Sequence, residues 1–216
     1  MRQMTMMGTL CVLVGCSAAG ANEPAMPNAP TPIAADAHAL IGEAAPNFVL
    51  PSIGGELVNL SDYAGKTVVL EWFNPGCPFV KDVHNADKVT SIANQWAAQD
   101  VVWIAINSGA LGKQGTGLDT NQRAASKWDI TYPVLLDESG AVGKAYGART
   151  TPHMYVIAPD GTLAFAGAFS NAPLGNVSGG DDEVNYVDAA LTAVTSGQPV
   201  AESAPKPWGC SVKYGS

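Results

Sequence analysis

Basic residues are scarce in this chain of 216 residues, which carries 11 Lys and Arg against 19 Asp and Glu. The resulting formal net charge of −8 argues against nucleic acid as a partner, because phosphate binding requires a basic surface. The sequence also lacks any run of about eighteen or more apolar residues, the length that a membrane-spanning helix requires. With 47% hydrophobic residues, the chain is long enough for one ordinary domain with its own core plus an appendage.

Only four cysteines are present, and the first two lie in a segment that is typical of a secretory signal. A basic start is followed by a short apolar run from Met4 to Val14, which leads into L-V-G-C ending at Cys16. This tetrapeptide resembles the lipobox of bacterial lipoproteins. The resemblance implies that residues 1–15 are a signal peptide and that a lipid on Cys16 anchors the protein to a membrane of the bacterial cell envelope, facing the periplasm or the exterior. The alternative is a plain signal peptide cut after Ala18 or Ala21.

The rest of the chain divides by composition into three parts. Residues 16–41 are rich in Ala, Pro and Asn without a periodic apolar pattern, which predicts an extended tether. Residues 42–198 are expected to form the folded domain, and residues 199–216 a tail that carries Cys210.

Strand and helix patterns alternate along the predicted domain. The strand 66–73 is apolar on both faces, which is typical of a central strand. The sequence therefore predicts an α/β fold, with a central mixed β-sheet flanked by helices and an N-terminal β-hairpin extension. The other expected elements are hairpin strands at 47–50 and 56–60, helices at 77–99, 119–128 and 181–196, strands at 101–106 and 133–137, a hairpin at 154–158 and 163–169, and a mobile Gly-rich surface loop at 107–118.

Four segments together resemble the thioredoxin superfamily, in particular its peroxiredoxin-like and thiol-specific antioxidant redoxin branch. They are G-E-A-A-P-N-F-V-L-P at 42–51, N-L-S-D-Y-A-G-K-T-V-V-L-E-W-F at 59–73, N-P-G-C-P-F-V-K at 74–81, and T-T-P-H-M-Y-V-I-A-P-D-G at 150–161. The resemblance implies a thioredoxin-like fold and a redox activity carried by cysteine, with no cofactor.

Cys77 is the candidate nucleophile, since it stands at a strand-to-helix junction in the position of the first cysteine of a C-x-x-C motif. Pro78 suits the first position of a helix, which puts Cys77 near the N-cap, where unpaired N–H groups stabilise a thiolate. Lys81, one turn further on, adds a positive charge. Both effects lower the pKa of a thiol, and only the thiolate is nucleophilic. The alternative is an inert cysteine packed as a small apolar residue.

The motif lacks its second cysteine, because its fourth position is Val80. A mixed disulfide on Cys77 therefore has no neighbouring thiol to release it. The peroxiredoxin signature is also incomplete: the peroxidatic cysteine of that family aligns with Val80, and Asn74 stands three residues before Cys77, where a threonine is expected. A lone activated thiolate can nevertheless reduce peroxide through a sulfenic acid.

Cys210 is the only other thiol if Cys11 is removed with the signal peptide and Cys16 carries lipid. It follows a Pro-rich segment that cannot be helical and could lie back across the domain toward Cys77. Three interpretations stay open: a distant resolving cysteine, a static disulfide with Cys77, or an unpaired thiol.

Glu71 lies six residues before Cys77, where thioredoxins carry a buried carboxylate that relays protons. Residues 69, 71 and 73 share one face of the strand, so we expect Glu71 beneath the active-site turn as a general acid or base. An ion pair with a neighbouring lysine is the alternative. His84, two helical turns beyond Cys77, is expected to be solvated.

Thr151 and Pro152 resemble the cis-proline loop that faces the active cysteine throughout the superfamily. The resemblance implies that the backbone groups of Thr151 are free to pair with a substrate strand. His153 and Arg149 are further candidates for substrate binding, through contact with the sulfur or with peroxide oxygens, or else they serve packing and surface roles.

The leading hypothesis is an envelope thiol-dependent oxidoreductase or antioxidant. Cys77 would attack a protein disulfide or a peroxide, and Cys210 or an external thiol reductant would resolve the product. The alternatives are a thiol peroxidase proper, a non-catalytic redoxin scaffold, and a copper-binding module with Cys77, Cys210 and His153 as ligands.

Overall fold

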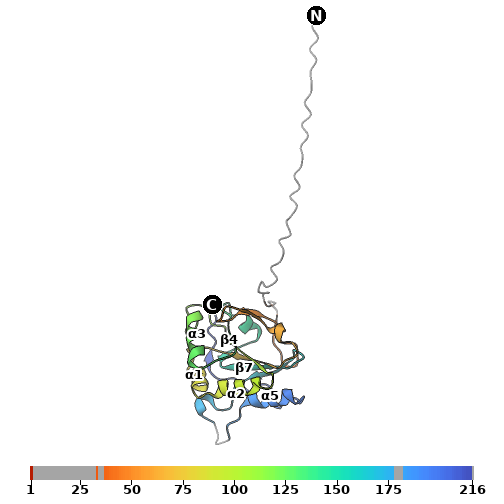
Figure 1. Cartoon of the computed structure of the whole chain (residues 1–216), viewed down its shortest axis with the longest axis vertical. Helices are drawn as coiled ribbons and strands as arrows, with labels where there is room; N and C mark the ends of the chain where they lie inside the picture. Colours follow the sequence, from red (N-terminus) through yellow and green to blue (C-terminus); the bar gives the residue numbers. More distant parts are fainter. Residues whose placement is uncertain (2–32, 34–36, 178–181, 216) are drawn as a thin grey trace.

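The computed structural model describes residues 1, 33, 37–177 and 182–215 (Figure 1). Nearly all of the predicted signal peptide (1–15), the lipidation site Cys16 and most of the predicted tether (16–41) lie outside the described residues. Within the described part, no helix has both the length and the apolar character needed to cross a membrane.

Five strands form the central sheet, in the order β5-β4-β3-β7-β8. The middle strand, β3 (Val68–Trp72), runs parallel to β4 (Val102–Asn107) and antiparallel to β7 (His153–Ile157). β5 (Val134–Leu136) and β8 (Leu163–Gly167) are the edges. All five residues of β3 are buried, as expected for a strand with apolar residues on both faces. The predicted mixed sheet with β3 at its centre is confirmed.

The remaining elements cover the two faces of the sheet. One face packs against the N-terminal hairpin and α4, and the other against the four longer helices. Figure 1 shows α2 and α5 side by side near β7, and the indole Nε1 of Trp96 in α2 donates to Asp188 in α5 over 2.7 Å. The first group is β1 (Val49–Pro51), β2 (Leu57–Asn59), η1 (Leu60–Tyr63) and α4 (Ala141–Ala145); the second is α1 (Pro78–Asn85), α2 (Lys88–Ala97), α3 (Leu118–Lys127) and α5 (Tyr186–Thr195).

Three short elements complete the described part of the fold. η2 (Pro173–Gly175) follows β8 and packs against α1. β6 (Thr150–Thr151) and β9 (Cys210–Ser211) pair with each other in a separate antiparallel sheet. The sequence did not predict β6, β9 or α4.

The prediction of one long helix over 77–99 is wrong, because two helices occupy this stretch. α1 ends at Asn85, whose side chain accepts a hydrogen bond from the indole of Trp128 over 2.8 Å. Asp87 then adopts a left-handed backbone conformation, with φ of 55°, which a right-handed helix cannot continue through.

The last helix begins later than the predicted residue 181, which itself lies outside the described residues. Asn185 is the N-cap of α5, and its side chain accepts a hydrogen bond from the backbone N–H of Asp188 over 2.9 Å. An asparagine in this role satisfies an otherwise unpaired N–H group and fixes where a helix starts.

The Gly-rich segment 107–118, predicted to be a mobile surface loop, is fastened to the domain. Ser108 is buried and links two core groups: its hydroxyl accepts from the Trp72 indole over 3.0 Å and donates to Asp137 over 2.6 Å. Asn107 is also buried and donates to Asn121 of α3 over 2.9 Å. This loop therefore lies against the end of the sheet from which α1 departs.

Candidate active site

Cys77 is the N-cap of α1, and Pro78 occupies the first helical position, as the sequence predicts. The extended backbone of Cys77, with φ of −76° and ψ of 127°, lets the chain turn from the sheet into the helix. The Cys77 side chain is fully buried, and its Sγ lies 3.0 Å from the carbonyl oxygen of Thr151. The thiol therefore sits at the positive end of α1 and faces the loop that carries Thr151.

The turn before Cys77 is held by the Gly-rich loop. Asn74 accepts from the backbone N–H of Gly76 over 2.8 Å and donates to the carbonyl of Gln114 over 3.0 Å. Gln114 in turn donates to the carbonyl of Gly76 over 3.2 Å. Gly115 has a positive φ of 75°, and a Cβ there would overlap the Asn74 side chain. Glycine is therefore required for the loop to approach the active-site turn.

The C-terminal tail brings Cys210 to Cys77. The Thr151–Pro152 peptide bond is cis, and Thr151, just before it, pairs with Cys210 in the register of β6 and β9. The Cys210 thiol lies close enough to Cys77 for each thiol to shift the pKa of the other. Both cysteines are free thiols in the structure. The backbone edge of Thr151, expected to be open to a substrate strand, is thus occupied by the chain itself.

The two sulfurs have opposite electrostatic environments. Burial raises the pKa of the Cys77 thiol. Hydrogen bonds from the Cys210 thiol, the Val80 backbone N–H, the Thr151 side chain and the Cys210 backbone together outweigh burial and hold this pKa below its ordinary value. Burial and the adjacent Cys77 raise the pKa of Cys210 to about 11. Cys77 is therefore the better nucleophile, and Cys210 stays a protonated donor to it.

Lys81 is exposed on α1, and its backbone N–H donates to the carbonyl of Cys77 over 3.0 Å. Its ammonium group is not among the groups that lower the pKa of Cys77. The pKa is instead lowered by the Cys210 thiol, the Thr151 side chain and the backbone groups of Val80 and Cys210, none of which carries a formal charge.

His153 lies away from the Cys77 sulfur. It belongs to the face of β7 that carries Tyr155, and its Nδ1 is 3.0 Å from the Tyr155 hydroxyl. Arg149 is exposed and lines the same surface cavity as His153 and Tyr155. Glu71, by contrast, shares a face of β3 with Val69 and Phe73, which pack against the helices. The structure thus separates His153 and Arg149 from the pair of thiols.

Burial, followed by the charge of Arg149, lowers the pKa of His153 to about 4. An unfolded histidine binds its proton below about pH 6.5, so between pH 6.5 and pH 4 the unfolded chain binds more protons than the folded one. Stability should therefore fall as the pH drops through this window, by about 3 kcal/mol from this group. Urea unfolding of the wild type and of His153→Gln across the window measures the difference. If the free energy of unfolding changed with pH equally in both proteins, His153 would not be the group responsible.

Glu71 is fully buried, and its main partner is a histidine rather than a lysine. Glu71 Oε1 lies 2.8 Å from Nε2 of His84, whose side chain is also fully buried. Its Oε2 accepts from the Trp103 indole over 3.2 Å and from the Tyr132 hydroxyl over 3.4 Å. Burial, and then the charge of Glu71, raise the pKa of Tyr132, which keeps this hydroxyl a donor.

The prediction that His84 is solvated is wrong. Its ring stacks on Trp128, with centroids 4.9 Å apart, and meets Phe73 edge-on at 5.5 Å. The sequence held a signal for this position, because His84 lies four residues after the buried Val80 and so on the same face of α1. In the described residues, no group of three or more His, Cys, Asp or Glu side chains is arranged to hold a metal ion.

Comparison with known proteins places this geometry in a family. The model of the AhpC/TSA family matches residues 41–166, which is more than half of the chain. The chain belongs to the AhpC/TSA family. The matched region contains the Cys77 turn, the cis-proline loop and the sheet between them, whereas Cys210 lies beyond it.

Relatives of this AhpC/TSA chain include a thiol-disulfide oxidoreductase ResA of Bacillus thuringiensis, 25% identical over 130 residues. That match covers 57% of this chain and 66% of the relative, just under two thirds of its length. Among solved structures, a hypothetical protein of Sinorhizobium meliloti is 28% identical with a TM-score of 0.72, over 82% of this chain and 96% of the other. Peroxidoxin BcpB of Mycobacterium tuberculosis, 18% identical over 74% of this chain and 98% of its own, has a TM-score of 0.52. The predicted thioredoxin-like fold is confirmed.

Proposed function

We propose that this protein is a thiol-disulfide oxidoreductase in which Cys77 is the nucleophile and Cys210 the resolving cysteine. The observation that carries the proposal is the β6–β9 pair, which places Cys210 opposite Thr151, the residue whose carbonyl oxygen lies 3.0 Å from the Cys77 sulfur. The pKa of Cys77 is lowered there and that of Cys210 is raised to about 11. The name of the ResA relative supports the same class of reaction.

The reaction proceeds in two exchanges. The Cys77 thiolate attacks one sulfur of a substrate disulfide, which forms a mixed disulfide and releases the other sulfur as a thiolate. Cys210 then loses its proton to that thiolate or to water and attacks the Cys77 sulfur, which releases the second half of the substrate. The substrate gains two electrons, and the enzyme is left with a Cys77–Cys210 disulfide. An external thiol reductant returns both cysteines to the reduced state.

The proposed location is the bacterial cell envelope, with a lipid on Cys16 as the anchor. The support is the apolar N-terminal run that ends in L-V-G-C. Expression of wild type and Cys16→Ser, followed by membrane fractionation, tests this part separately. Retention of Cys16→Ser in the membrane fraction would remove the lipid anchor from the proposal.

The ionisation of Cys77 tests the chemistry directly. The ultraviolet absorbance of the thiolates is titrated in the wild type and in Cys77→Ser. The thiolate that forms in the wild type well below the raised pKa of Cys210 belongs to Cys77. We expect the Cys77 thiolate to form at a pH below the ordinary thiol pKa of about 8.5. Removing the main hydrogen-bond donor in Cys210→Ala should move this titration upward. A Cys77 titration at or above the ordinary pKa would refute the proposal.

The same shift affects stability, and its sign follows from the lowered folded-state pKa. The ionised Cys77 contributes stability at a pH above the unfolded pKa, and this contribution is lost as the pH falls through the folded pKa.

A further inference from the structure

The segment 208–214, which we call the strap, covers the cis-proline loop. β9 within it pairs with β6, and Thr151 in β6 is the residue whose carbonyl faces the Cys77 sulfur. Any extended polypeptide that added itself to β6 as a strand would need this same backbone edge. The strap therefore fills the position beside Cys77 where a protein substrate would bind by strand addition.

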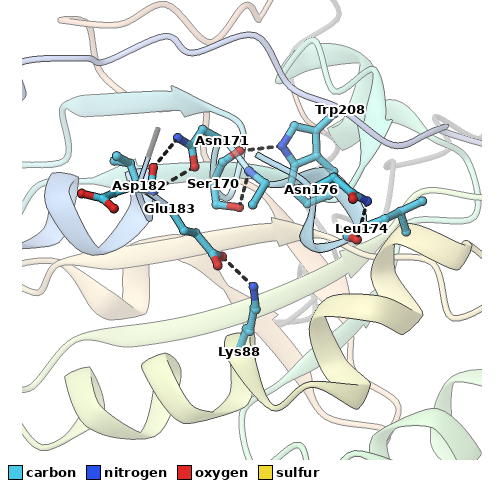
Figure 2. Close-up of polar contacts among 10 residues, drawn as sticks. Lys88, Ser170, Asn171, Leu174, Asn176, Asp182, Glu183 and Trp208 are labelled. Atoms are coloured by element: carbon cyan, nitrogen blue, oxygen red, sulfur yellow. Dashed lines mark hydrogen bonds and ion pairs between the residues drawn. The ribbon is translucent and has the colours of Figure 1, made fainter. Parts of the chain in front are cut away.

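The strap is anchored at both ends by an aromatic side chain. At one end, the Trp208 indole donates to the carbonyl of Ser170 over 2.6 Å (Figure 2), and its ring lies 5.9 Å from that of Phe79 in α1. At the other end, the Tyr214 hydroxyl donates to the carbonyl of Ala148 over 2.8 Å. The strap is thus fixed on both sides of Cys210.

Backbone hydrogen bonds fasten the strap between these anchors. The N–H of Val212 donates to the carbonyl of Arg149 over 3.0 Å, and the carbonyl of Lys213 accepts from Ala110 over 2.8 Å. A polypeptide substrate would have to displace these bonds together with the β6–β9 pair. A small disulfide forms no strand, so it does not need this backbone edge.

Gly209 is the residue that lets the strap come this close. Its φ is +135°, and a Cβ built on it would lie 2.2 Å from the carbonyl oxygen of Thr151. A side chain at this position must therefore push the strap away from β6. Cys77 and its turn lie outside the strap, whereas Cys210 moves with it, so the substitution is judged by the ratio of two rates rather than by either rate alone.

We propose that the strap makes this enzyme selective for small disulfides over polypeptide disulfides, with Gly209 as the specificity-determining residue. This inference rests on the proposed thiol-disulfide oxidoreductase activity and adds the class of substrate. If the backbone edge at the cis-proline loop were open, we would expect an extended polypeptide to be the preferred substrate. The strap predicts the opposite preference.

The test compares two probes in single turnovers of the pre-reduced full chain. The small probe is 5,5′-dithiobis(2-nitrobenzoate), and the polypeptide probe is insulin, both in excess. The reaction is followed by mass spectrometry as the loss of the reduced thiols of the enzyme. Each rate is divided by the rate of dithiothreitol with the same probe, which corrects for the intrinsic reactivity of the two disulfides. The insulin-to-small-disulfide ratio of the wild type should be well below that of dithiothreitol.

Gly209→Ala should raise this ratio about tenfold, because it strains the backbone that holds the strap in place. Tyr214→Ala, which removes the far anchor, should change the ratio in the same direction and serves as the second variant. The matched control is Gly161→Ala, at a similarly positive φ of 86° in the turn between β7 and β8, with open space around it and no contact with the strap. The control should keep the wild-type ratio.

Two failures are distinguishable. If the wild type reacts with both probes at the ratio of dithiothreitol, or if neither strap variant changes the ratio, the selectivity proposal is wrong while the activity stands. If the wild type reacts with neither probe faster than a free cysteine does, the proposed function itself is wrong.

Discussion

One equivalent of a small disulfide is expected to join Cys77 to Cys210 in the wild type, whereas Cys210→Ser stops at a mixed disulfide on Cys77. The reason is that Cys210 supplies the thiol that the C-P-F-V motif lacks at Val80. Without Cys210, the mixed disulfide on Cys77 can be released only by an external thiol. Mass spectrometry of the unreduced protein separates the two products, because only the mixed disulfide retains half of the substrate.

Cys77→Ser provides the opposite control and should show almost no reaction. In the wild type, burial and Cys77 raise the pKa of Cys210 to about 11, and loss of Cys77 leaves burial, the largest cause, in place. Burial alone still raises the pKa of Cys210, so little thiolate is present at pH 7. Equal labelling of Cys77→Ser and Cys210→Ser would show that the roles are not divided as proposed.

Local sequence patterns were sufficient to predict the parts of the site formed by neighbours along the chain. The apolar run of β3, Cys77 as an N-cap and Pro78 at the first helical position all depend on short-range chemistry. The cis bond before Pro152 followed from the resemblance at 150–161. These features can be predicted from short stretches of sequence, because a strand-to-helix junction and a proline each restrict the backbone locally.

The features that the sequence missed depend on contacts between distant segments. The sequence allowed the tail to lie back toward Cys77 but did not reveal its anchors, since Trp208 and Tyr214 bind backbone carbonyls rather than an apolar face. The break at Asp87 depends on a left-handed residue that helical periodicity does not reveal. His84 is polar, and its burial is stable only because a carboxylate from β3 meets it.

Among the ion pairs of the described residues, the buried pair of Glu71 and His84 should contribute most to the free energy of unfolding. Glu71→Ala removes the acceptor of His84 Nε2, the Trp103 indole and the Tyr132 hydroxyl at once. Breaking one side of such a pair leaves buried polar groups without partners, so we expect a loss of about 3–5 kcal/mol in the free energy of unfolding. Urea denaturation measures this loss.

The matched control is the exposed pair of Asp119 and Arg123 on α3, whose side chains are 86% and 69% exposed. Asp119→Ala should cost less than about 1 kcal/mol, because solvent screens such a pair. Similar losses from Glu71→Ala and Asp119→Ala would show that burial does not strengthen the Glu71 network.

Glu71→Gln separates the catalytic role of the carboxylate from its structural one. The amide keeps an oxygen that can accept from Trp103 and Tyr132, so the protein should remain folded. It cannot take up and release a proton, so if Glu71 acts as the general acid or base, the second exchange should slow, since Cys210 must lose a proton there. A stopped-flow measurement of the step from mixed disulfide to Cys77–Cys210 disulfide decides this. An unchanged rate and pH profile would confine Glu71 to holding His84 and the helix α1 against the sheet.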